Sequence, residues 1–71
     1  MNRQISSFIK GLVDRKKLEI KTWTPRQRWE KLEQFQGLLA EARKVNNSMN
    51  ITYFSEIIDF LEDLEEQDVQ N

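Results

Sequence analysis

The chain contains no cysteine and no histidine among its 71 residues. Their absence excludes a disulfide framework and any zinc site built from Cys and His ligands. It also excludes nucleophilic catalysis by Ser-His or Cys-His pairs. With only two glycines, the chain has no glycine-rich loop that could hold a phosphate group. We therefore expect a protein that is not an enzyme and that binds no cofactor, metal or small-molecule substrate.

Long apolar runs are missing as well. Residues 1–17 contain no apolar run longer than two residues, which predicts that no secretory signal peptide is present. No segment approaches the roughly 20 consecutive apolar residues that a membrane-spanning helix needs. The lack of cysteine fits the reducing cytosol. We expect a cytoplasmic protein that does not enter a membrane.

The chain is short enough to form one domain, residues 1–71. A chain of this size buries only about 60% of the surface that it exposes when unfolded, so its core is marginal. Disulfides, a metal or self-association usually compensate for this deficit. Because the composition removes the first two, we favour self-association or a permanent partner, with a well-packed monomeric bundle as the alternative.

Charge is unevenly distributed along the sequence. Residues 1–31 carry nine Lys or Arg and three Asp or Glu, a net charge of +6. Residues 32–71 carry two Lys or Arg and nine Asp or Glu, a net charge of −7. Such a division indicates a surface for a charged partner, or two halves of one fold that attract each other.

The first predicted helix spans residues 3–17, with Asn2 as its N-cap. Its apolar residues recur at helical spacing and form one stripe: Ile5, Phe8, Ile9, Leu12 and Val13. After this helix, Leu18 and Ile20 alternate with charged residues at a period of two, which is typical of extended backbone. We predict an extended linker that places Leu18 and Ile20 in the core.

The second predicted helix spans residues 25–45. Thr24, Pro25 and Gln27 have the pattern of a capping box, with proline at the first helical position. The apolar residues that follow recur at three- and four-residue intervals and lie on one side of the helix: Leu32, Phe35, Leu38, Leu39 and Ala42.

A loop is predicted at residues 46–50, where Asn and Ser favour turns. The third predicted helix spans residues 51–67, capped by Ser48, Asn50 or Thr52, and residues 68–71 are expected to fray. Its apolar stripe is broad: Tyr53, Phe54, Ile57, Ile58, Phe60, Leu61 and Leu64. The predicted fold is all-α, a small three-helix bundle with an extended linker between its first two helices.

The segment TPRQRWEKLEQFQ, residues 24–36, resembles the opening of the first helix of a homeodomain. That resemblance implies a third helix rich in Arg and Lys with a Trp-Phe-x-Asn core. Residues 51–67 contain no basic residue, and a helix of that charge is repelled by DNA phosphates. We attribute the resemblance to shared helix capping and assign the chain to no family.

Two groups of residues are candidates for binding a partner. Trp and Arg are enriched among residues that dominate interface energies, and they cluster between residues 23 and 29. The third helix offers more apolar surface than a three-helix monomer needs, although Tyr53 and Phe60 also suit a gap against the first helix. The candidates are Trp23, Arg26, Arg28, Trp29, Tyr53 and Phe60.

From these features we expect a small protein–protein interaction module, regulatory or adaptor in role, that forms a homodimer. Apolar burial along the first and third helices would drive pairing, and the basic and acidic halves would orient it. One alternative is a nucleic-acid-associated regulator that uses the basic residues between 15 and 31. Another is an inhibitor that occupies a basic site on a nucleic-acid-binding protein with the seven acids between 56 and 68.

Overall fold

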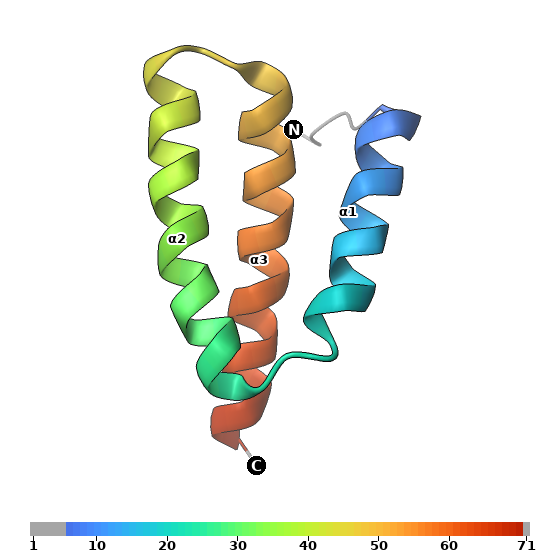
Figure 1. Ribbon diagram of the computed structural model, residues 1–71, viewed down its shortest axis with the longest axis vertical. Coiled ribbons are helices and arrows are strands. Elements are labelled where there is room, and N and C mark those ends of the chain that lie inside the picture. Colours follow the sequence, from blue (N-terminus) through green and yellow to red (C-terminus); the bar gives the residue numbers. More distant parts are fainter. Residues whose placement is uncertain (1–5, 71) are drawn as a thin grey trace.

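The computed structural model describes the backbone of residues 6–70 and the side chains of residues 6–67. It contains three α-helices, α1 (Ser7–Ile20), α2 (Pro25–Lys44) and α3 (Ser48–Gln70), and no strand within the described range (Figure 1). The predicted all-α fold with three packed helices is therefore confirmed. None of these helices combines the length and the hydropathy that a membrane crossing requires.

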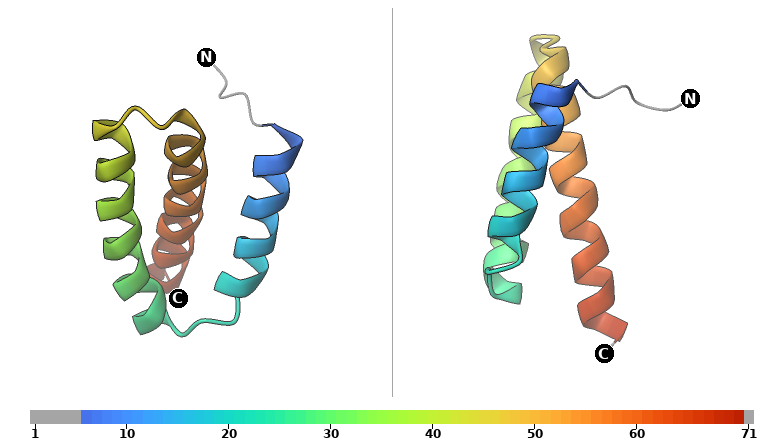
Figure 2. Two further views of the ribbon diagram at one scale, coloured as in Figure 1. Left: turned by 45° about the horizontal axis from the view of Figure 1, so that its top comes forward. Right: turned by 90° about the vertical axis from the view of Figure 1, so that its right-hand side faces the viewer.

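The helix α3 is the centre of the bundle. It packs along most of α2 and along α1, whereas α1 and α2 approach each other only marginally. Figure 2 shows α1 and α2 side by side in one layer, with α3 behind them in a second layer. Sequential helices run antiparallel, as short connections favour, and α1 and α2 diverge away from the turn that joins them (Figure 1).

The helix α1 differs from its prediction at its C-terminal end. It continues to Ile20, so the predicted extended linker over residues 18–20 is wrong, and the connection to α2 is a short turn over residues 21–24. Ile20 lies seven residues beyond Val13, which places both on the same helical stripe, and Ile20 is fully buried. Leu18 lies on a different side of the helix and is exposed, so the alternating pattern did not reflect a strand.

At its N-terminal end α1 begins at Ser7, where the Ser6 hydroxyl accepts a hydrogen bond from the backbone N–H of Ile9. The predicted cap Asn2 and the apolar residue Ile5 lie outside the described residues. Within the described stripe, Ile9 and Val13 are buried as predicted. Phe8 and Leu12 are exposed instead, because the contact with α3 covers only one flank of the stripe.

The helix α2 follows its prediction to within one residue. Thr24 and Gln27 form the predicted capping box, with 3.1 Å between the Gln27 nitrogen and the Thr24 hydroxyl. At the other end, Asn46 adopts a left-handed conformation with φ of 58°. The N–H groups of Asn46 and Asn47 donate to the carbonyls of Arg43 and Ala42, which is the pattern of a Schellman motif.

The helix α3 is longer than predicted at both ends, because it starts at Ser48 and runs to Gln70. Its cap is Asn47, whose side-chain oxygen accepts a hydrogen bond from the Asn50 N–H at 3.1 Å. The three predicted capping residues therefore lie inside the helix. The predicted frayed tail is helical to Gln70, and Asn71 lies outside the described residues.

The core is formed by a small set of aliphatic side chains from all three helices. The fully buried side chains Ile20, Ile57 and Leu61 lie at its centre. The other buried residues are Ile9, Val13, Leu32, Ala42 and Ile58. A second layer of partly buried side chains packs against this core: Trp23, Phe35, Leu39, Tyr53, Phe60 and Leu64. Aromatic residues therefore lie mainly at the margin of the core, where part of each ring meets solvent.

Candidate partner-binding surface

The structure divides the predicted Trp and Arg cluster into two parts. Trp23, in the turn between α1 and α2, packs against the core and is half-buried. Its carbonyl oxygen accepts a hydrogen bond from the Arg28 guanidinium at 2.9 Å, which ties the turn to the first turns of α2. Trp23 and Arg28 thus have a structural role, with part of each side chain still reaching the surface.

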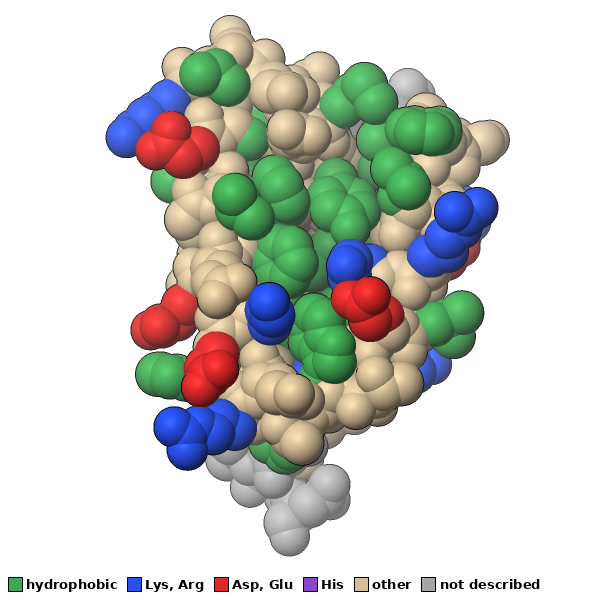
Figure 3. Space-filling model, in the orientation of Figure 1, with side chains coloured by type: hydrophobic (Ala, Val, Ile, Leu, Met, Phe, Trp, Pro, Cys, Tyr) green, Lys and Arg blue, Asp and Glu red, His purple; other side chains and the backbone are tan. Residues whose placement is uncertain are grey.

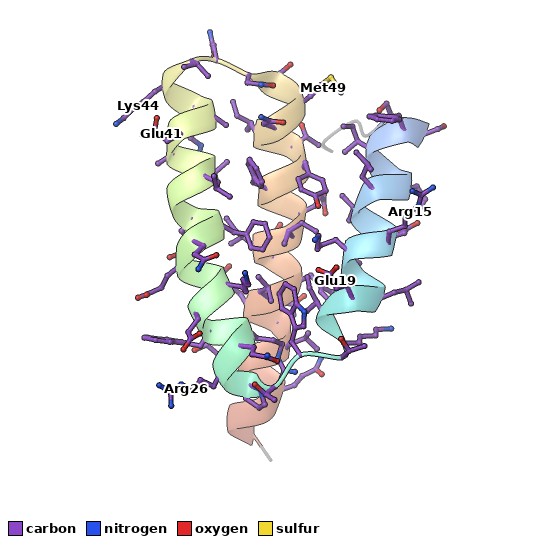
Figure 4. The ribbon with its side chains drawn as sticks, in the orientation of Figure 1. Arg15, Glu19, Arg26, Glu41, Lys44 and Met49 are labelled. Atoms are coloured by element: carbon purple, nitrogen blue, oxygen red, sulfur yellow. The ribbon has the colours of Figure 1, made fainter. Side chains whose placement is uncertain are left out.

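Arg26 and Trp29 lie on the outer side of α2. The Arg26 side chain points away from the other two helices (Figure 4) and forms an ion pair with Glu30 at 3.3 Å. The Trp29 side chain is half-exposed. The four residues therefore do not form one continuous surface, because residues two positions apart on a helix, such as Arg26 and Arg28, point to nearly opposite sides of its axis.

Tyr53 and Phe60 both pack against the core from α3 and remain partly exposed. The ammonium group of Lys17 on α1 lies 5.3 Å from the centre of the Phe60 ring, a distance typical of a cation–π contact. Phe60 therefore fills the space between α1 and α3. Tyr53 instead contacts Phe54 edge-on, with 5.4 Å between ring centres.

Several exposed apolar residues that the sequence placed in the core share one surface. On α1, Phe8 is 65% exposed and Leu12 is 37% exposed. On α2, Leu38 is 46% exposed and lies one turn beyond Phe35, whose ring is 5.9 Å from that of Phe54. Figure 3 shows apolar side chains gathered between α2 and α1 on this side of the molecule.

The same surface continues into charged residues toward the turn that joins α1 and α2. Lys16 and Glu19 form an ion pair at 2.9 Å, and Figure 4 shows Glu19 where α1 faces α2. On α2, Arg28 and Lys31 lie seven residues before Phe35 and Leu38, which places them on the same side of the helix. These four charged residues carry a net charge of +2.

We name this surface the α1–α2 face. Its apolar end consists of Phe8, Leu12, Phe35, Leu38, Tyr53 and Phe54. Its basic end consists of Lys16, Glu19, Arg28 and Lys31. The sequence identified Tyr53 and Arg28 as candidates but missed Phe8, Leu12 and Leu38. No sequence signal separates these three from core residues, since their helical spacing is that of a buried stripe.

A pocket of about 240 Å³ lies where the first turns of α1 and α3 come together. It is lined by Ser6, Ile9, Ser48, Met49 and Thr52, and Figure 4 shows Met49 on the side of α3 toward α1. The hydroxyl groups give the pocket a mixed polar and apolar lining. It is an open depression at the end of the bundle.

The outer side of α3 is acidic. The helix contains seven Asp or Glu and no Lys or Arg, and Asp59, Glu62, Asp63 and Glu66 are exposed. In contrast, residues 6–44 carry ten Lys or Arg and five Asp or Glu, a net charge of +5. Among the side chains that the structure describes, no group of three acidic residues is arranged to hold a metal ion.

The fold thus defines a small all-helical protein of three packed helices. No known protein family, no curated protein and no solved structure matches the chain.

Proposed function

We propose that this protein is a small non-enzymatic interaction module, regulatory or adaptor in role, that binds another protein through the α1–α2 face. The observation that supports the proposal is the exposure of Phe8, Leu12 and Leu38 on one side of two helices that barely touch each other. Contiguous exposed apolar surface of this kind marks interaction sites on soluble proteins.

The face also has the residue types that interfaces use. Partly buried aromatic rings from α2 and α3 lie at its apolar end, and basic residues border them. Interfaces commonly combine an apolar centre containing aromatic residues with a polar rim. Nucleic-acid binding receives less support, because Trp23 packs against the core and four Lys or Arg side chains in the described region are paired with carboxylates within their own helices.

Site-specific photocrosslinking tests the proposal. A photoreactive amino acid replaces Phe8 or Leu38 on the face, and Leu18 or Val45, which are 66% and 71% exposed, serve as matched controls. After irradiation in cells that produce the chain, the lysate is treated with nuclease. We expect protein adducts from the two face positions and none from the controls.

The mass of the adduct distinguishes the forms of the interaction. An adduct of twice the 8.6 kDa chain identifies the homodimer, and any other mass identifies a different protein. Equal adducts at all four positions, or no adduct at any, would contradict the proposal.

A further inference from the structure

We draw no further inference here: the strongest candidate, the apolar end of the α1–α2 face with its exposed residues Phe8, Leu12 and Leu38, belongs to the surface already described, and nothing in the structure shows what covers it.

Discussion

The α2–α3 hairpin and α1 are stabilised to different degrees. The hairpin has helices of 20 and 23 residues, a capping box at the start of α2, and a Schellman motif followed directly by the Asn47 cap at the turn. The helix α1 has 14 residues, packs mainly on α3, and leaves Phe8, Leu12 and Leu18 exposed.

This difference shows that the small core of a chain without disulfides does not bury all three helices to the same extent. The hairpin closes by local interactions and buries one side of α3, while α1 covers only the remaining flank with Ile9, Val13 and Ile20. These three buried side chains lie along one flank of α1, and among the described residues the other flank has no helix packed against it. The apolar surface that remains uncovered is the surface that we propose for binding.

The largest expected effect comes from Ile57→Ala in the centre of α3. Ile57 is fully buried, and such a truncation costs about 2–5 kcal/mol because it leaves a cavity. A domain of this length has about 4–10 kcal/mol of total stability. We expect the free energy of unfolding, measured by urea denaturation, to fall by roughly half, with all three helices lost together. Unfolding of α1 alone would show that packing around Ile57 does not couple the unfolding of α1 to that of the hairpin.

A smaller effect, confined to α1, is expected from Ile9→Ala. Ile9 is buried but borders the pocket at the end of the bundle, so we expect a cost near 2 kcal/mol, the lower end of the range for such truncations. Native-state hydrogen exchange should show reduced protection over α1 and little change over α2. Equal loss of protection in both helices would contradict the division into two regions.

The smallest effects are expected from glycine replacements in the two regions. A Cβ atom added at Gly11 in α1 or at Gly37 in α2 meets no atom within 4 Å, and neither glycine has a positive φ. Each change to alanine should therefore stabilise its helix by about 0.5–1 kcal/mol. In hydrogen exchange, Gly11→Ala should raise the protection of the α1 amides and so bring it closer to that of the hairpin. Gly37→Ala should not reduce this difference in protection. A destabilising Gly11→Ala would indicate a contact on that side of α1.

Much of the fold could be predicted from local patterns. The capping box at Thr24 and Gln27 placed the start of α2 correctly, because both of its hydrogen bonds form between residues three apart in the chain. The end of α1 was predicted wrongly, because Leu18 and Ile20 satisfy a strand pattern as well as a helical one. Only the position of α3 next to Ile20 resolves this ambiguity.

The candidate surface was predicted less well than the fold. Trp23 and Trp29 are close in sequence and similar in chemistry, yet Trp23 packs against the core and Trp29 is half-exposed. Phe8 and Leu12 have the spacing of core residues but lie outside the contact with α3. Burial depends on where a neighbouring helix lies, and that information is not present in the periodicity of a single helix.

The sequence by itself determined that this protein is helical, where α2 begins, and that no Cys or His chemistry is available to it. These properties depend on residue identity and on interactions over three or four residues. The tertiary structure decided which flank of α1 is buried, how the Trp and Arg cluster is divided, and that apolar and basic residues from α1 and α2 form one face. These properties depend on the separation of α1 and α2 across α3, which only the packing of the three helices sets.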